Sequence, residues 1–422
     1  MIWKSPSWRW LLPGMRVKRY AALAGLGFLL ALFGVGLASA GAPFPELARW
    51  LLARGSSPVA VGVLLVAVGT ALLILGLRAM NRSILAVLTD PDRVPELVYR
   101  RRRLEAGPRI AALGGGTGLS RLLRGLKRIS ANTTAVVAVT DDGGSTGRLR
   151  RAFDIPAVGD LVDCLAALSE APRAQELMQY RFARGGELEG HTFGNLFLVT
   201  LHELTGSFSE ALRSANRLLA LSGAVWPSTC EPAVLVAEFS DGRRVEGETA
   251  IRAARGRIQR LRLSPPDPEV MPEVVRALER AELVILGPGS LYTSVIASFL
   301  PGAVRKALVR TPARLVQVVN LMTEPGETDG MDAFAHVEAL ARHLGRWPEV
   351  AVVHTAPIPL SVRQRYIAEG QHPVAYDPKP FLERGIRVLS GDFREEGPLA
   401  QHDPKKLVAA VQRLFVQKEV LM

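Results

Sequence analysis

Two long stretches without a charged residue lie within the first eighty residues and restrict what this part of the chain can form. They are residues 20–40 (YAALAGLGFLLALFGVGLASA) and residues 58–77 (PVAVGVLLVAVGTALLILGL). Each is long enough, as a helix, to cross a hydrocarbon core of about 30 Å at 1.5 Å per residue. A signal peptide has a shorter apolar region. We therefore expect two transmembrane helices joined by an external link at residues 41–57.

The orientation of this hairpin follows from the positions of its basic residues. Five Lys or Arg residues precede the first span in residues 1–19, and seven follow the second span in residues 78–107, whereas the link contains only Arg49 and Arg54. Because basic residues stay on the cytoplasmic side, we expect a cell-membrane protein with both termini and the main domain in the cytoplasm. The run of four arginines at residues 100–103 is expected to contact anionic lipid headgroups, which makes membrane lipids a partner.

The net charge of the chain, +12 from 52 Lys+Arg and 40 Asp+Glu, at first suggests a nucleic-acid-binding protein. Residues 1–107 contain 14 of the basic and 5 of the acidic residues, so they carry +9, and residues 108–422 carry only +3. A nearly neutral domain offers no basic face, and we expect no nucleic-acid partner. Cys164 and Cys230 form neither a zinc motif nor a disulfide framework.

Residues 108–422 alternate short apolar runs with helical patterns, which predicts an α/β domain with a mostly parallel sheet. Strands are expected at residues 109–113, 134–140, 283–286, 315–320, 350–354 and 386–389. Helices are expected at residues 119–129, 159–168, 194–204, 208–221, 269–281, 332–344, 361–369 and 404–416. Residues 233–250 are expected to form a β-hairpin around an Asp-Gly turn.

The first strand is followed by Gly114, Gly115, Gly116, Thr117 and Gly118 and then by a helix. Glycines let the backbone approach a ligand closely, and the N–H groups at a helix start bind phosphate oxygens. The loop is neither a Walker loop nor a dinucleotide fingerprint, because Leu119 replaces the third glycine of the latter. It predicts a phosphate or pyrophosphate site, with a plain glycine-rich turn as the alternative.

The second strand ends in TDDGGSTGRLR, which places Asp141 and Asp142 at the same sheet edge as the glycine loop. Two adjacent carboxylates there suit sugar hydroxyls or a Mg²⁺ ion bound to phosphate. A solvated turn is the alternative. The residues that follow, Gly143, Gly144, Ser145 and Thr146, form a second stretch able to accept an anion.

Three further segments complete the candidate cleft. In HTFGNL, Asn195 is expected to cap a helix, with His191 just upstream. Gly287, Gly289 and Ser290 belong to a second strand–glycine–helix junction, GPGSLYTS, whose spacing is not that of a nucleophile elbow. Asn320 begins NLMTEPGETDG after another strand. Loops of one kind at successive strand ends predict a single polar cleft.

These motifs, together with GDLVDCLAAL, resemble the YvcK-type gluconeogenesis factor family, which is related in fold to CofD, the 2-phospho-L-lactate transferase. The resemblance covers residues 108–422 and leaves out residues 1–107. It implies a Rossmann-like, CofD-like sheet with helices on both faces. It further implies binding of UDP-N-acetylglucosamine and support of cell-wall synthesis and cell shape during gluconeogenic growth. Envelope-synthesis proteins are then possible partners.

The resemblance also extends the site to two tyrosines, Tyr292 and Tyr366. The candidate nucleotide-sugar-binding residues are Gly114, Gly115, Gly116, Thr117, Gly118, Asp141, Asp142, Gly143, Gly144, Ser145, Thr146, His191, Asn195, Gly287, Gly289, Ser290, Tyr292, Asn320 and Tyr366. No catalytic residue is identified, and no cofactor is required apart from a candidate Mg²⁺ at Asp141 and Asp142. The favoured hypothesis is a regulator without turnover. The alternative is a CofD-like, Mg²⁺-dependent transferase that moves a phospho-acyl group from a nucleotide-activated donor.

Overall fold

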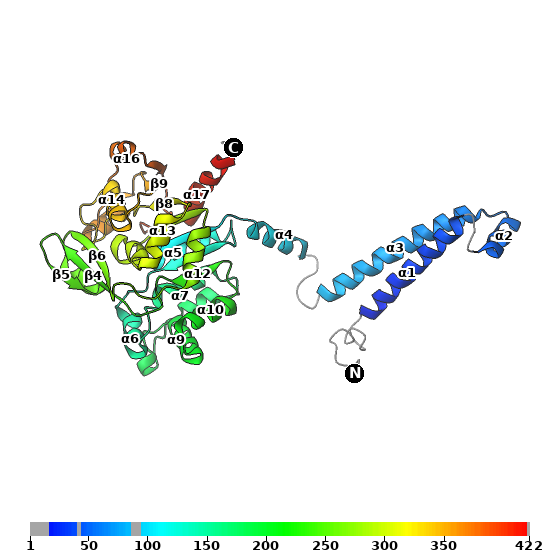
Figure 1. The fold of residues 1–422 in the computed structure, drawn as a ribbon, viewed down its shortest axis with the longest axis horizontal. Helices are drawn as coiled ribbons and strands as arrows, with labels where there is room; N and C mark the ends of the chain where they lie inside the picture. The colour runs from blue at the N-terminus through cyan, green and yellow to red at the C-terminus, as the bar shows by residue number, and fades with distance from the viewer. Residues whose placement is uncertain (1–16, 40–43, 86–93, 420–422) are drawn as a thin grey trace. The chain divides into compact units, whose positions relative to one another are not determined.

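The computed structural model describes residues 17–39, 44–85 and 94–419 (Figure 1). The chain divides into two compact units, residues 1–101 and residues 102–422. Most of the expected basic segment 1–19, the last residue of the first expected span and residues 86–93 of the expected linker lie outside the described residues.

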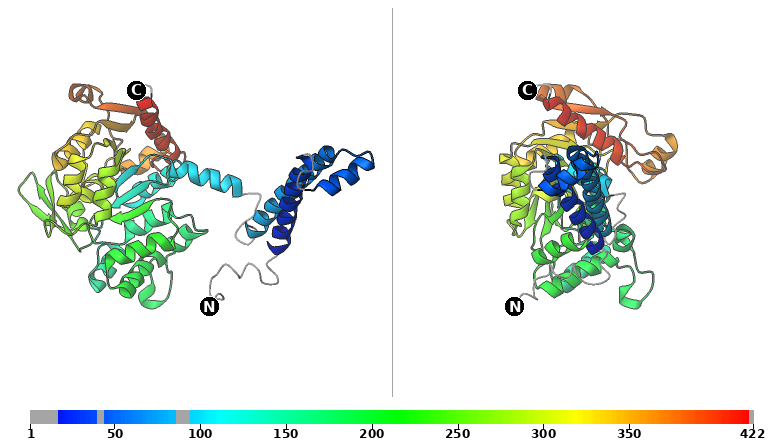
Figure 2. Two further views of the ribbon diagram at one scale, coloured as in Figure 1. Left: turned by 45° about the vertical axis from the view of Figure 1, so that its right-hand side comes forward. Right: turned by 90° about the vertical axis from the view of Figure 1, so that its right-hand side faces the viewer.

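The first unit is built from two long apolar helices, α1 (Val17–Ala38) and α3 (Pro58–Leu85), which run side by side (Figures 1 and 2). Both are long and apolar enough to cross a membrane, over Lys18–Ala38 and Pro58–Ser83. The second helix continues past the expected end at residue 77. The link between them contains a short helix, α2 (Pro45–Ala53), that the sequence did not predict.

Close packing of α1 on α3 depends on small residues at the contact. A Cβ atom on Gly27 would lie 2.4 Å from the Leu73 amide nitrogen, and one on Gly69 would lie 2.4 Å from the amide nitrogen of Ala31. A Cβ atom on Gly62 would lie 2.5 Å from the amide nitrogen of Ala38. These backbone contacts are too short for any larger side chain, as in membrane helix pairs joined through small residues. The two helices therefore form one antiparallel unit.

Replacing Gly27 by leucine is expected to separate α1 from α3, because the new side chain would overlap the α3 backbone. The matched control is Gly25→Leu, since nothing lies within 4 Å of a Cβ at Gly25. Spin labels on the exposed Leu29 and Leu64 of the full chain in detergent report the helix separation. We expect the distance to increase by about 2 Å in Gly27→Leu only. Equal spin-label distances in Gly27→Leu and Gly25→Leu would contradict the close packing of α1 on α3.

The second unit contains a seven-stranded sheet in the order β10-β9-β8-β7-β1-β2-β3, and every neighbouring pair is parallel. Its strands are β1 (Ile110–Gly114), β2 (Thr133–Val137), β3 (Ala224–Pro227), β7 (Leu283–Leu286), β8 (Arg314–Val318), β9 (Val350–His354) and β10 (Arg387–Gly391). All six predicted strands are confirmed. The short edge strand β3 was missed, because four residues that include a proline carry little pattern.

Helices cover both faces of this sheet, as expected (Figures 1 and 2). In β1, Ile110 and Ala112 face one core and Ala111 and Leu113 face the other, since successive residues of a strand point to opposite faces. The first face packs on α5 (Gly116–Leu126), α7 (Gly159–Leu168), α9 (Phe193–Thr205), α10 (Phe208–Leu218) and α17 (Pro404–Glu419). The second packs on α12 (Pro272–Arg280), α13 (Gly302–Arg310), α14 (Ala333–Leu344) and the π-helical turn Leu291–Ile296.

All eight predicted helices are present. One of them is α15 (Leu360–Ala368), which was predicted at residues 361–369. Besides α2, the structure adds α4 (Val94–Glu105), α6 (Gly144–Phe153), α8 (Ala174–Gln179), α11 (Glu248–Ala254), α13 and α16 (Lys379–Arg384). Helix α6 was hidden because its glycine-rich start looked like a loop.

The predicted β-hairpin at residues 233–250 was correct only in its first half. Strands β4 (Val234–Phe239) and β5 (Arg244–Glu246) pair antiparallel, but Gly247, at φ +91°, ends β5 and the chain continues into α11. A third strand, β6 (Ile258–Ser264), pairs with the other edge of β4. The result is a separate three-stranded sheet whose apolar side contributes to the second core.

Candidate functional site

The strand order places β1 beside β7 at the centre of the large sheet. From β1 the chain proceeds outward through β2 to β3, and from β7 it proceeds the other way through β8 and β9 to β10. Ligands of open parallel sheets bind at such a reversal, beyond the carboxyl ends of the strands. The glycine loops at residues 114–118 and 287–290 leave these two strands, so both lie at this point.

The two loops touch through their backbones. A Cβ atom on Gly118 would lie 2.6 Å from the carbonyl oxygen of Pro288, so only glycine permits this approach. Gly116 has a φ of +61°, in the left-handed region, and Gly115 faces the Asp160 carboxylate so closely that a Cβ there would lie 2.3 Å from Oδ2. Glycine is therefore required in this loop by conformation and by contact.

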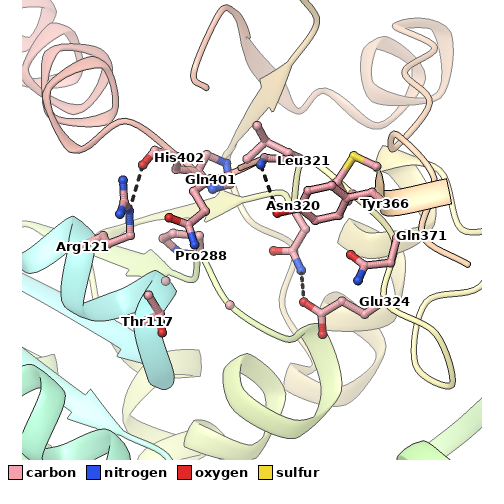
Figure 3. Close-up of a pocket in the computed structure, with 14 residues that line it drawn as sticks. Thr117, Arg121, Pro288, Asn320, Leu321, Glu324, Tyr366, Gln371, Gln401 and His402 are labelled. Carbon is pink, nitrogen blue, oxygen red and sulfur yellow. Dashed lines mark hydrogen bonds between the residues drawn. The ribbon is translucent and has the colours of Figure 1, made fainter. Parts of the chain in front are cut away.

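One cavity of about 180 Å³ lies at this junction, and we call it the Tyr366 cavity (Figure 3). It combines residues that follow β1, β7 and β8 with two segments from the C-terminal part of the chain. Its lining residues are Thr117, Gly118, Arg121, Pro288, Gly289, Asn320, Leu321, Met322, Glu324, Tyr366, Gln371, Ala400, Gln401 and His402.

Hydrogen bonds fix the polar side chains of the Tyr366 cavity. The Tyr366 hydroxyl accepts the backbone N–H of Ala400 at 3.1 Å, and Asn320 Nδ2 donates to Glu324 Oε1 at 3.1 Å (Figure 3). Arg121 donates to the carboxylate of Glu395 and to the His402 carbonyl oxygen. The phenol, the amide and the guanidinium are thus held in place before any ligand arrives.

Burial shifts the pKa values of two titratable groups of the Tyr366 cavity. It lowers the pKa of His402 to about 3, so the imidazole is uncharged at pH 7. It also raises the pKa of Glu324. Arg121 brings a guanidinium group to the cavity wall, where it is paired with the Glu395 carboxylate.

A second cavity of about 440 Å³ lies beyond β2, and we call it the Ser145 cavity. It contains the second predicted loop and the starts of three helices. Its lining residues are Asp141, Gly143, Gly144, Ser145, Thr146, Gly159, Asp160, Val162, Asp163, Met178, Gln179, Arg181, Thr192 and Asn195. Eleven of the nineteen candidate residues thus line one or the other of these two cavities rather than one cleft. The other eight, which line neither, are Gly114, Gly115, Gly116, Asp142, His191, Gly287, Ser290 and Tyr292.

Ser145, His191 and Asn195 meet at the Ser145 cavity. Ser145 Oγ lies 2.7 Å from His191 Nδ1, and Asn195 Nδ2 donates to Ser145 Oγ at 3.2 Å. The expectation that Asn195 caps helix α9 was wrong. Thr192 is the cap, because its Oγ1 accepts the backbone N–H of Asn195, which leaves the Asn195 side chain for Ser145.

Asp141 and Asp142 have different partners. Asp141 Oδ1 accepts the N–H of Gly143 at 2.9 Å and lines the Ser145 cavity. Asp142 Oδ1 instead accepts the hydroxyl and the N–H of Thr249, at 2.6 and 3.1 Å, and so joins α11 to the loop. Over residues 17–39, 44–85 and 94–419, no three His, Cys, Asp or Glu side chains form a group suited to a metal. The candidate Mg²⁺ at Asp141 and Asp142 stays a prediction.

The side chains of Tyr292 and Ser290 have different surroundings, although the residues are two positions apart in sequence. The Tyr292 ring is 3% exposed in the second core and its hydroxyl donates to the Ile258 carbonyl oxygen at 3.4 Å, so it lines neither of the two cavities. Ser290 bonds to Glu324, a lining residue of the Tyr366 cavity.

Sequence reasoning missed two largely buried acids, Asp160, which lines the Ser145 cavity, and Glu248. Burial, assisted by the charges of Asp141 and Asp163, raises the pKa of Asp160 from 3.8 to about 7. Burial, with the charges of Asp141 and Glu327 next, raises the pKa of Glu248 from 4.5 to about 8. Asp160 was visible in GDLVDC, but its burial depends on contacts between loops distant in sequence.

The raised pKa of Glu248 predicts a pH-dependent stability. Between pH 4.5 and about 8 the folded chain binds more protons at this carboxyl than the unfolded chain does, so the free energy of unfolding falls as pH rises through this window. Glu248→Gln is expected to remove on the order of 2 kcal/mol of this dependence, allowing for partial solvent exposure. Urea unfolding at pH 5 and pH 8 measures it, with the exposed Glu246→Gln as control. If the free energy of unfolding changed equally between pH 5 and pH 8 in the parent chain and in Glu248→Gln, the raised pKa of Glu248 would be contradicted.

Known proteins share this fold and sequence. Residues 110–394 match the family model described as 2-phospho-L-lactate transferase CofD. The gluconeogenesis factor of Bacillus subtilis is 39% identical over 311 residues, which cover 73% of this chain and 98% of that protein. A relative from Deinococcus radiodurans is 42% identical over 417 residues, covering 96% of this chain and 89% of its own. A crystal structure of a Bacillus halodurans protein has a TM-score of 0.70 and 38% identity, covering 72% of this chain and 99% of that one.

The Deinococcus match also corrects one expectation. A match over 96% of the chain includes most of the first hundred residues. The expectation that the resemblance leaves out residues 1–107 was therefore wrong, and the N-terminal helices are shared with at least one relative.

Proposed function

The chain belongs to the gluconeogenesis factor family, and we propose that its folded domain binds UDP-N-acetylglucosamine at the Tyr366 cavity as a regulatory ligand. Under this proposal the protein senses a cell-wall precursor and supports cell-wall synthesis and cell shape during gluconeogenic growth. Envelope-synthesis proteins are its proposed partners.

The observation that carries this proposal is the position of the Tyr366 cavity. It lies where the order of the parallel strands reverses, and loops from β1, β7 and β8 all contribute to it. That is the position at which open α/β sheets bind nucleotides. Gly118 has no side chain between the start of α5 and the Pro288 backbone, so a ligand can approach the main chain there.

The lining groups match the parts of a nucleotide-sugar. The N–H groups of Thr117 and Gly118 lie in the first turn of α5, which has no side-chain cap, and such groups bind pyrophosphate oxygens. Tyr366 offers a ring to a planar base, and Asn320 and Gln401 offer amides to sugar or base. A cavity of about 180 Å³ holds part of such a ligand, and the remainder extends along the sheet edge.

Calorimetric titration of the full chain in detergent with UDP-N-acetylglucosamine tests this site. We expect saturable binding that weakens at least about tenfold in Tyr366→Ala, because a stacked base contributes about 1–3 kcal/mol. Tyr99→Ala, an exposed tyrosine on α4, is the matched control and is expected to bind normally. Binding of GDP or NAD without binding of UDP-N-acetylglucosamine would refute the proposal.

We also propose that α1 and α3 tether the domain to the cytoplasmic side of a membrane. Their length and composition support it, as does the excess of basic residues outside the link. In intact cells, Ser56→Cys in the link is expected to react with a membrane-impermeant maleimide. Ser240→Cys in the domain is the control and is expected to react only after lysis. Labelling of Ser240→Cys but not Ser56→Cys in intact cells would reverse the orientation.

A second candidate is a CofD-like transferase, favoured by the family match over residues 110–394. It would move a phospho-acyl group from a nucleotide-activated donor to an acceptor. Incubation with nucleotide-activated phospholactate, a deazaflavin acceptor and Mg²⁺ separates the two candidates. Release of the nucleotide with formation of the transfer product would establish the transferase, and its absence would favour the regulator.

A further inference from the structure

We infer that Ser145 is an activated nucleophile, with His191 as its base, and that the Ser145 cavity accepts a phosphate ester or anhydride whose phosphorus this serine attacks. This activity differs from ligand binding at the Tyr366 cavity and does not depend on it. It rests on the arrangement of three side chains, a helix start and a cavity.

The three side chains form a directed chain of hydrogen bonds. Ser145 Oγ lies 2.7 Å from His191 Nδ1, the distance of a strong hydroxyl–imidazole bond. Asn195 Nδ2 donates to the same oxygen at 3.2 Å and so occupies one of its two lone pairs. With His191 in the Nε2–H tautomer, Nδ1 accepts the Ser145 hydroxyl proton. A nucleophile and a base within hydrogen-bond distance are the central pair of covalent catalysis, and here Asn195 holds the nucleophile rather than the base.

The surroundings of His191 keep its imidazole neutral, as a base must be. Its side chain is largely buried, and Arg148 and Arg181 donate to the carbonyl oxygens of Glu189 and Gly190 immediately before it. Burial first, and then these two guanidinium charges, lower the pKa of His191. The Nδ1 lone pair is therefore available to the Ser145 proton at pH 7.

The start of α6 provides the place for phosphate oxygens. Gly143 caps this ten-residue helix without a side chain, and the first intrahelical bond is from the Gly147 N–H to the Gly143 carbonyl oxygen. The N–H groups of Gly144, Ser145 and Thr146 thus have no partner within the helix and open toward the cavity. With the helix dipole and Arg181, they form the anion-binding part of the cavity next to Ser145. The carboxyl groups of Asp141, Asp160 and Asp163 also line the cavity, and the pKa of Asp160 is raised to about 7.

The step balances without a further reactant. As Ser145 Oγ forms a bond to phosphorus, its proton passes to His191 Nδ1 and the bond from phosphorus to the leaving oxygen breaks. The leaving oxygen then takes the proton from His191. Water, activated by the same imidazole, hydrolyses the serine phosphoester and restores the free hydroxyl.

A fluorophosphonate probe tests the reactivity of Ser145 directly, because Oγ forms the bond to phosphorus as fluoride leaves. With the full chain in detergent, peptide mass spectrometry is expected to show Ser145 labelled at least about tenfold faster than Ser240, an exposed serine between β4 and β5. Ser145→Ala is expected to lose this adduct, and Ser240→Ala is the matched control that keeps it.

The role of His191 is tested by His191→Gln, which keeps a hydrogen-bond acceptor but cannot take up the proton. Labelling of Ser145 is expected to slow about 100-fold while the thermal unfolding midpoint stays close to that of the parent chain. Labelling of Ser145 no faster than Ser240 in the unmodified chain, or equal labelling in folded His191→Gln, would overturn the inference. UDP-N-acetylglucosamine titration and fluorophosphonate labelling of the unmodified chain are separate measurements, so either proposal can fail while the other holds.

Discussion

The backbone contact between Gly118 and Pro288 is the constraint on which the rest of the site depends. It joins the first turn after β1 to the first turn after β7, at the centre of the sheet where the strand order reverses. Because no side chain intervenes, the start of α5 lies directly beside the loop after β7, and the residues after β8 close the cavity from the far side. A side chain at position 118 would separate the two halves of the sheet edge that together form the Tyr366 cavity.

The same sheet edge has two chemically different regions. At the Tyr366 cavity the imidazole of His402 is neutral and the Arg121 guanidinium is paired with the Glu395 carboxylate. At the Ser145 cavity an uncapped helix start and a serine–histidine–asparagine group lie beside buried acids such as Asp160. Acids with raised pKa values cost stability at neutral pH, and such groups gather at functional sites. The domain carries almost no net charge, so anion binding depends on helix starts and a few fixed arginines.

The sequence predicted the fold well wherever a local pattern was strong. Uncharged runs identified both long helices of the first unit, and apolar runs identified the central strands, because burial on both faces leaves a continuous apolar segment. It failed where the outcome depended on distant contacts. Asn195 looked like a cap but Thr192 performs that role, and the bond between Asp142 and Thr249 could not be predicted. The burial of Tyr292, the third strand β6 and the contact of Ser145 with His191 depend on packing between residues 19 to 46 positions apart, which a single sequence does not reveal.

A crystal structure of the chain with UDP-N-acetylglucosamine tests the central claim most directly. The account predicts density for the ligand at the junction of the loops after β1, β7 and β8, with the pyrophosphate at the N–H groups of Thr117 and Gly118 and a ring of the ligand against Tyr366. Ligand density confined to another part of the domain, with the Tyr366 cavity occupied by solvent alone, would contradict it.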